Sequence, residues 1–120
     1  MTYRKYRALK TTVGSITFDS GLEAKRYTQL KMLEKAGTIK NVQIQPKFRL
    51  MDSYKYDGKT IRAIDYIADF MYEEDGKRIV EDVKGIRTKD YIIKSKLFMK
   101  KYILELGYID EFIELKAGGF

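Results

Sequence analysis

The chain has 120 residues, the length of one domain, and it contains neither cysteine nor histidine. The absence of both residue types excludes zinc clusters, thiol nucleophiles, catalytic triads and histidine general bases, and it leaves carboxylates as metal ligands, which suit magnesium or manganese. Its 24 basic and 17 acidic residues give a net charge of +7, which is typical of proteins that bind a polyanion such as nucleic acid. No apolar run of transmembrane length and no secretory signal is present, which predicts a cytoplasmic protein without membrane contact.

Basic side chains gather in two stretches of the sequence. Residues 1–10 contain four of them and no acid, and residues 87–101 contain six against one acid. Such side chains contact phosphates, and the candidates are Arg4, Lys5, Arg7, Lys10, Arg87, Lys89, Lys94 and Lys96. The sequence leaves open whether residues 1–10 form a mobile arm that orders on nucleic acid or an ordinary frayed terminus.

The first helix has clear start and stop signals. Residues 12–18 predict a short strand or hairpin, after which Ser20 and Glu23 form a capping box, and Gly37 ends a helix predicted over residues 22–36. The helical period turns Glu23 toward the core side. Two roles for Glu23 remain open, because a capping-box glutamate binds the backbone at the helix start and an inward carboxylate can also serve a metal site.

A three-stranded meander is predicted next. Residues 42–54 are β-rich, and Asp57-Gly58 is a hairpin turn that makes paired residue numbers sum to 115. This register places Gln45 opposite Phe70. It also predicts that the first strand is an edge or is bulged at Pro46, because proline cannot donate to the ladder.

A second turn, at Asp75-Gly76, brings candidate functional residues together. Paired numbers then sum to 151, so Asp69 faces Asp82, and Lys84 falls opposite Ile67 on the same face. Like charges opposite each other destabilise a sheet, and a divalent cation with a lysine beside it would offset this. A metal site is therefore indicated. A solvated hairpin face also carries charges, however, and a bulge would break the alignment, so both interpretations stay open.

Alternation along residues 64–72 divides the middle strand into two faces. The even-numbered residues are the more apolar and predict a packed face, which leaves Asp69 and Met71 on a partly functional face. Strand parity sends Glu81 to the packed face beside Phe70. We interpret Glu81 as a structural residue, a buried partner for a basic side chain, unless a bulge makes it a metal ligand.

A second helix is predicted over residues 89–106, with Thr88 as N-cap and Gly107 as its stop. It carries a broad packing stripe and a second apolar line, the latter formed by Ile93, Leu97 and Leu104. The second line favours either a homodimer or a cover within the monomer by a terminal strand predicted over residues 108–115. The sequence does not decide between them.

Six segments carry a resemblance to a known superfamily: Phe18-Asp19-Ser20, Glu23-Ala24-Lys25-Arg26-Tyr27, Gln45-Pro46-Lys47-Phe48, Tyr66-Ile67-Ala68-Asp69-Phe70, Val80-Glu81-Asp82-Val83-Lys84-Gly85 and Lys94-Ser95-Lys96-Leu97-Phe98. With these the chain resembles the PD-(D/E)XK nuclease superfamily, and within it a family of small phage and prophage endonuclease-like proteins. The similarity covers most of the chain. It departs from the superfamily pattern at Ala68, because a proline often precedes the active aspartate.

The resemblance implies a fold, a cofactor and a set of site residues. The implied fold class is α/β, more narrowly α+β, in a single domain over residues 1–120. Its core is restriction-endonuclease-like, with the element order αβββαβ, and helices flank a mixed sheet that contains an antiparallel meander. Asp69 and Asp82 would bind one or two Mg²⁺ ions, for which Mn²⁺ can substitute, and Lys84 would position or activate the attacking water. Glu23 and Val83 are further metal ligands that the resemblance implies.

These expectations converge on a magnesium-dependent DNA endonuclease that hydrolyses phosphodiester bonds. Small archaeal and phage Holliday junction resolvases share this fold and act as dimers, which favours branched DNA as the substrate, a role in DNA recombination and a site of action in the host bacterial cytoplasm. Two alternatives stay open. One is a catalytically idle nucleic-acid-binding or recombination accessory module, and the other is a phage inhibitor or adaptor that acts on a host protein.

Overall fold

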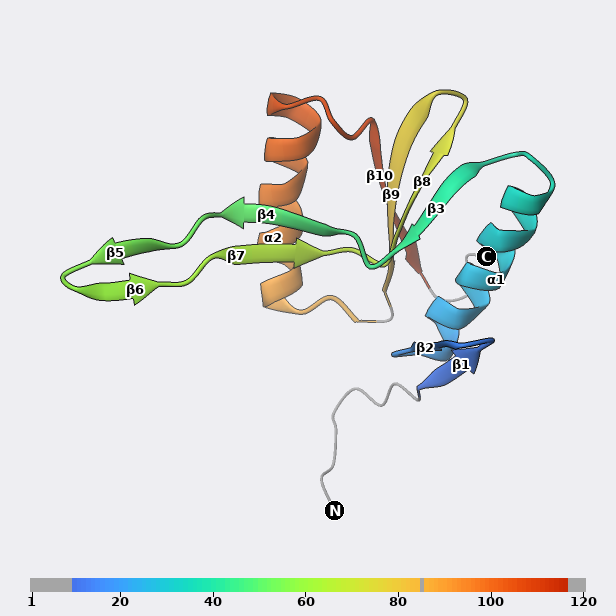
Figure 1. Cartoon of the computed structure of the whole chain (residues 1–120), viewed down its shortest axis with the longest axis horizontal. Coiled ribbons are helices and arrows are strands. Elements are labelled where there is room, and N and C mark those ends of the chain that lie inside the picture. The colour runs from blue at the N-terminus through green and yellow to red at the C-terminus, as the bar shows by residue number, and fades with distance from the viewer. Residues whose placement is uncertain (1–9, 85, 117–120) are drawn as a thin grey trace, which may run out of the picture.

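The computed structural model describes residues 10–84 and 86–116 and shows a mixed α+β protein (Figure 1). A short hairpin of β1 (Thr11–Val13) and β2 (Ile16–Phe18) precedes helix α1 (Gly21–Lys35). The strands that follow are β3 (Lys40–Ile44), β4 (Lys47–Met51), β5 (Tyr54–Tyr56), β6 (Lys59–Ile61), β7 (Ile64–Ile67), β8 (Phe70–Glu74) and β9 (Lys77–Lys84). The chain ends with α2 (Lys89–Phe98), the π-helical turn η1 (Met99–Glu105) and β10 (Glu111–Lys116).

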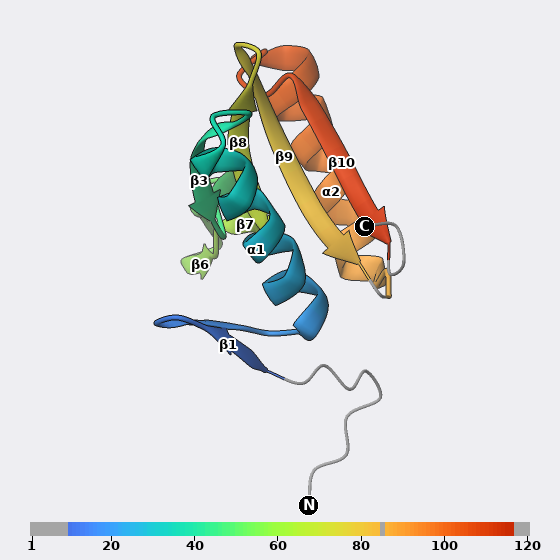
Figure 2. The ribbon, with the colours of Figure 1, turned by 90° about the vertical axis from the view of Figure 1, so that its right-hand side faces the viewer.

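A four-stranded mixed sheet lies at the centre, in the order β10-β9-β8-β3. β3, β8 and β9 pair antiparallel, and β10 joins β9 in parallel. The two helices lie on opposite faces of this sheet (Figure 2). The predicted α+β class with a mixed sheet is therefore confirmed. No helix in the described residues is both long and apolar enough to cross a membrane.

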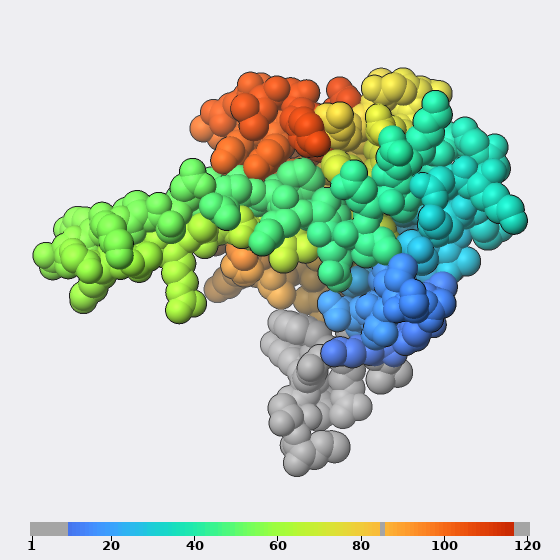
Figure 3. Space-filling model, viewed as in Figure 1, coloured from blue at the N-terminus to red at the C-terminus, as the bar shows by residue number. Residues whose placement is uncertain are grey.

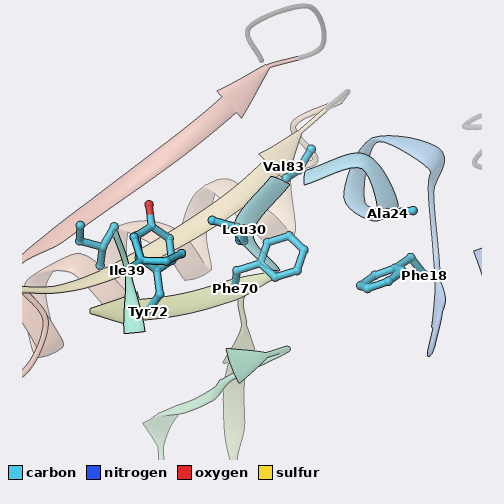
Figure 4. Packing of buried hydrophobic residues seen from close by; sticks show 8 residues of the cluster. Phe18, Ala24, Leu30, Ile39, Phe70, Tyr72 and Val83 are labelled. Carbon is cyan, nitrogen blue, oxygen red and sulfur yellow. The ribbon is translucent and has the colours of Figure 1, made fainter. Parts of the chain in front are cut away.

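Helix α1 and the sheet enclose the first hydrophobic core. Leu30 from the helix and Phe70 from β8 are completely buried in it, together with Phe18 from β2 (Figure 4). The Phe18 and Phe70 ring centroids lie 6.2 Å apart. Rings packed in this way stabilise a core by more than their buried area alone, so the β1–β2 hairpin is held to the sheet by aromatic contact.

Helix α2 covers the opposite face with a second core. Phe98 is completely buried there, and its ring lies 4.7 Å from Phe48 of β4 and 5.1 Å from Tyr66 of β7. Val80 of β9 is also fully buried in this cluster. Because successive strand residues point to opposite faces, β9 supplies side chains to both cores. The polar side chains of β9 that are buried in this way need hydrogen-bond or ion-pair partners.

Both predicted helices begin at their predicted caps. Ser20 Oγ accepts a hydrogen bond from the Glu23 N–H at 3.1 Å, and Thr88 Oγ1 accepts one from the Tyr91 N–H at 3.1 Å. The second helix differs from its prediction, because its α-helical part ends at Phe98 and a π-helical turn replaces the rest.

The predicted terminal strand enters the central sheet as β10 and does not cover the second apolar line of the last helix. Ile93, Leu97 and Leu104 remain 59%, 47% and 78% exposed. Of the two alternatives that the sequence left open, cover of this line by the terminal strand is therefore excluded. The line is free to meet another surface.

The two hairpin turns set the predicted registers close to the turns, and bulges change them further away. β8 and β9 pair with numbers that sum to 151 as far as Phe70 and Glu81. β5 and β6 keep the sum of 115, but the register shifts by one residue between Arg49 and Met51. The prediction of Gln45 opposite Phe70 was therefore wrong, and Ile44 occupies that position.

A second irregularity lies where β7 gives way to β8. Ala68 packs in the α2 core, whereas Phe70 packs in the α1 core, and Met71 returns to the α2 core. Simple alternation places Ala68 and Phe70 on one packed face and Met71 on the partly functional face. That prediction was wrong, because Ala68 and Phe70 lie in different cores and Met71 is buried in the α2 core. The chain turns its faces over at Asp69, which lies between the two strands.

A buried ion pair ties α1 to β9. Glu81 is fully buried, and Arg26 donates to both of its carboxylate oxygens, from Nε at 2.8 Å and from Nη2 at 2.7 Å. The Tyr72 hydroxyl donates a further hydrogen bond to Glu81. Glu81 is thus a buried partner of a basic residue, on the face toward α1.

Removal of the Arg26 side chain should strongly destabilise the protein. Arg26→Ala leaves the Glu81 carboxylate buried without its cation, and such a loss costs about 3–5 kcal/mol of unfolding free energy. Urea unfolding measures it. Lys31→Ala is the matched control on the same helix, because Lys31 forms an exposed ion pair with Glu34, and such pairs contribute little to stability. Equal effects of the two variants would contradict a structural role for the buried pair.

Candidate functional site

Two acidic side chains meet beside the end of the β8–β9 ladder. Asp69 lies just before β8, and its N–H donates to the Glu81 carbonyl at 3.2 Å. Asp69 Oδ2 accepts a hydrogen bond from the Val83 N–H at 2.6 Å. The Asp82 carboxylate is close enough for its negative charge to raise the pKa of Asp69. The prediction that these residues come together is met by their side chains, although they are not partners in the regular ladder, which ends at Phe70.

Asp82 is fully buried, and each of its oxygens has a different neighbour. The Tyr66 hydroxyl donates to Oδ2. Oδ1 accepts no hydrogen bond, although Lys84 Nζ lies 2.7 Å away as an ion-pair partner. A buried carboxylate oxygen without a hydrogen bond is costly. The Lys84 ammonium group is therefore the contact that offsets the burial of Oδ1.

Lys84 is held between Asp82 and an aromatic ring. Its side chain is 25% exposed, and Nζ lies 4.2 Å from the centroid of the Tyr91 ring, within the range of a cation–π contact. The Tyr91 hydroxyl in turn donates to Glu114 Oε2 at 2.5 Å. The predicted position of Lys84 opposite Ile67 was wrong, because the ladder of β8 with β9 ends at Phe70 and Glu81 and β7 does not pair with β9.

Burial and the neighbouring negative charge raise the pKa of one carboxyl group at the site, that of Asp69. The pKa of Asp69 is raised well above its ordinary value, first by burial and then by the negative charge of Asp82. The Val83 N–H opposes this shift because it stabilises the charged form. At neutral pH Asp69 therefore keeps its proton. A cation that displaces this proton would relieve the repulsion.

Glu23 reaches the edge of the same site from α1. Its pKa is raised, chiefly by burial and by Asp19, and Lys84 and Asp82 also act on it electrostatically. In the described part of the chain no three acidic side chains lie close enough together to hold a metal ion. The close group is thus the pair of Asp69 and Asp82, and a ligand role for Glu23 stays a prediction.

Val83 has two different contacts at the site. Its backbone N–H binds Asp69, as described for the carboxylate pair, and its side chain is buried in the α1 core. The residue therefore fixes the Asp69 carboxylate through the main chain. Its role as a metal ligand stays a prediction.

The predicted phosphate contacts differ in their availability. Lys10, Lys89 and Lys96 are exposed. Arg87 approaches Glu114 at 3.4 Å, and Lys94 approaches Asp90 at 3.5 Å, so both already have acidic neighbours. Three further candidates lie outside the described residues: Arg4, Lys5 and Arg7.

Sequence reasoning missed the two tyrosines that hold the site. Strand alternation had placed Tyr66 on a purely packed face, and Tyr91 had been assigned only to the packing stripe of the helix. The face reversal at Asp69 brings Tyr66 onto Asp82, and the path of the chain after β9 brings Tyr91 over Lys84. A polar hydroxyl on each apolar stripe was the available signal, since buried tyrosines need a hydrogen-bond partner.

The fold and the site define a mixed α+β protein in which a partly buried aspartate, Asp69, lies beside a fully buried one, Asp82, with Lys84 next to Asp82. The chain belongs to the family described as "Protein of unknown function (DUF1064)", whose model matches residues 3–116. No curated protein matches the chain.

One solved structure, described as "Crystal structure of SSO0001", is similar at 17% sequence identity and a TM-score of 0.37. The match covers 80% of this chain and 46% of that one, so the chain spans less than half the length of that protein.

The Asp69→Asn variant should be more stable than the natural protein at neutral pH without metal. The unfolded aspartate has a pKa of about 3.9, and the folded value is higher. Between these two values the folded state binds more protons, so the unfolding free energy falls as pH rises, by up to about 1.4 kcal/mol per pH unit.

Urea unfolding in EDTA across the range from pH 4 to pH 8 measures this effect. The asparagine variant should lose the part of the slope that Asp69 supplies. If the asparagine variant keeps the natural pH dependence, the pKa of Asp69 is not raised in the folded protein.

Proposed function

We propose that this protein is a magnesium-dependent DNA endonuclease of the PD-(D/E)XK type. The observation that carries the proposal is the pair of partly buried Asp69 and fully buried Asp82, with Lys84 Nζ 2.7 Å from Asp82. The order of elements, a helix, three antiparallel strands, a helix and a parallel strand, supports comparison with the restriction-endonuclease-like core.

The donor set fits a hard divalent cation. Magnesium is usually held by one or two carboxylates together with water and substrate phosphate, and the site offers two neighbouring carboxyl groups, those of Asp69 and Asp82. Asp82 Oδ1 accepts no hydrogen bond and contacts only the Lys84 ammonium group, so it could also serve a metal ion as a ligand atom. Asp69 and Asp82 would therefore hold the ion, with Glu23 and Val83 as further candidates. When bound, the ion supplies Lewis-acid activation of water and of the scissile phosphate.

Lys84 has a separate task in this proposal. Its ammonium group is confined between Asp82 and the Tyr91 ring, so it keeps one orientation. From there it would orient the attacking water and offset the charge that develops on the phosphate. Tyr66 acts through Asp82, because its hydroxyl binds the oxygen that faces away from Lys84.

The charge of the chain supports DNA as the substrate. A net charge of +7 attracts phosphates without base readout, and Lys10, Lys89 and Lys96 are exposed for such contacts. Branched DNA, as cut by Holliday junction resolvases, is the substrate class that we favour. The exposed apolar line on the last helix would suit the dimer that such a symmetric substrate requires.

Cleavage assays test the proposal. Labelled four-way junction, flap, duplex and single-stranded DNA are incubated with Mg²⁺, Mn²⁺ or EDTA. We expect metal-dependent cutting that falls at least about 100-fold in Asp82→Asn and in Lys84→Met, because each change removes an electrostatic contact to the reacting groups. Gel analysis of the products ranks the substrates.

Asp75→Asn is the matched control for this assay. Asp75 is exposed in the β8–β9 turn with φ 52°, a conformation that asparagine tolerates, so cutting should be unchanged. Binding of DNA without cutting under any metal would instead favour the catalytically idle accessory module.

Homodimer formation has its own test. Leu97 is 47% exposed in the middle of the apolar line, so Leu97→Glu should reduce the dimer fraction measured by light scattering after gel filtration, by at least about tenfold in association constant, because it places a charge in an apolar contact. Met32→Glu is the control, since Met32 is 67% exposed on α1. A natural protein that is monomeric at all concentrations would contradict the dimer.

A further inference from the structure

A β-hairpin formed by β5 and β6 projects from the body of the protein (Figures 1 and 3). Its two strands pair only with each other. Every residue from 52 to 60 is exposed, so the hairpin, here called the arm (residues 52–62), adds nothing to either hydrophobic core. An element of this kind is not explained by the stability of the fold.

Two tyrosines lie on one face of the arm. Tyr54 and Tyr56 are two residues apart in β5, which places both side chains on the same side of the hairpin, and they are 50% and 72% exposed. Their cross-strand partners are Ile61 and Lys59. The face is therefore an aromatic surface with a cation at its outer end.

The charge of the arm is positive. Lys55, Lys59 and Arg62 are exposed, and none of the three forms an ion pair within the described residues. Of the two acids, Asp52 is paired with Arg49, and Asp57 occupies the turn. Exposed aromatic rings interleaved with unpaired cations match a nucleic-acid strand, whose bases stack on rings while its phosphates meet the cations.

We propose that the arm binds unpaired nucleotides of a DNA substrate by stacking bases on Tyr54 and Tyr56. This inference rests on the proposed nuclease function, because it takes DNA as the partner of the whole protein. It adds the part of the DNA that the arm recognises, a single-stranded or opened stretch, since paired bases do not present their faces for stacking.

The length of chain between the arm and Asp69 limits how far apart they can lie. β7 leads from the arm directly to Asp69, and the ten residue steps from Lys59 to Asp69 span at most about 33–36 Å when extended. One turn of duplex DNA has about the same length. The arm is therefore placed to hold unpaired bases about one helical turn or less from the scissile phosphate.

A second copy of the chain is the competing partner for the arm, because tyrosines are also common in protein interfaces. The charge argues against it. Two arms in contact would bring together the cations Lys55, Lys59 and Arg62 of each copy, none of which forms an ion pair within the described residues. The surface that suits a second copy is the apolar line of the last helix.

Binding without cleavage tests the inference. The protein is titrated in EDTA against a duplex that contains a short single-stranded gap with 2-aminopurine, and against the fully paired duplex. We expect tighter binding to the gapped duplex and a drop in 2-aminopurine fluorescence. Tyr54→Ala/Tyr56→Ala should bind the gapped duplex at least about tenfold more weakly, lose the fluorescence change and bind the paired duplex within about twofold of the natural protein.

Tyr54→Phe/Tyr56→Phe is the matched control, because phenylalanine keeps the ring and removes the hydroxyl. It should retain both the affinity and the fluorescence change. Thermal unfolding of all variants should match the natural protein, since neither tyrosine belongs to a core.

The outcomes separate this inference from the nuclease proposal. An alanine variant that binds the gapped duplex like the natural protein overturns the arm inference, even if the protein cuts DNA. A variant that changes only the oligomeric state also overturns it, in favour of a second copy. Stacking by a protein that cuts no DNA under any metal upholds the arm and contradicts the nuclease.

Discussion

The ion pair of Arg26 with Glu81 positions the elements that carry the site. Glu81 and Asp82 are neighbours in β9 and point to opposite faces of the sheet, so a helix that holds Glu81 also fixes where Asp82 lies. Glu23 precedes Arg26 by three residues and shares its side of α1. One buried pair thus orients both the strand carboxylate and the helix carboxylate, and its cost of burial is met by the two oxygen contacts and the Tyr72 hydroxyl.

The site of Asp69 and Asp82 lowers the stability of the folded protein. Asp82 is fully buried and Asp69 lies partly buried beside it, which raises the pKa of Asp69, and the cation Lys84 lies against Asp82. Proteins often accept such a local loss of stability where function requires it. The aromatic cores on both faces of the sheet provide the compensating stability, because each combines a fully buried phenylalanine with neighbouring rings.

The quality of the sequence predictions follows the range of the interactions behind them. Helix caps and hairpin turns depend on residues a few positions apart, so Ser20, Thr88 and the Asp-Gly turns were located correctly. Bulges depend on how strands pack against distant helices. The extra residue between Arg49 and Met51 and the reversal at Asp69 therefore escaped prediction, and with them the placement of Gln45, Met71 and Tyr66.

By itself the sequence determined the α+β class, the turn that brings the segment of Asp69 beside that of Asp82, and the excess of positive charge. These features follow from local pattern and composition. Only the tertiary structure decided which side chains contact each carboxylate, that the apolar line of the last helix stays exposed, and that residues 52–62 project as an arm. The physical reason is that burial and side-chain contacts depend on where whole elements pack, which no single segment of the chain encodes.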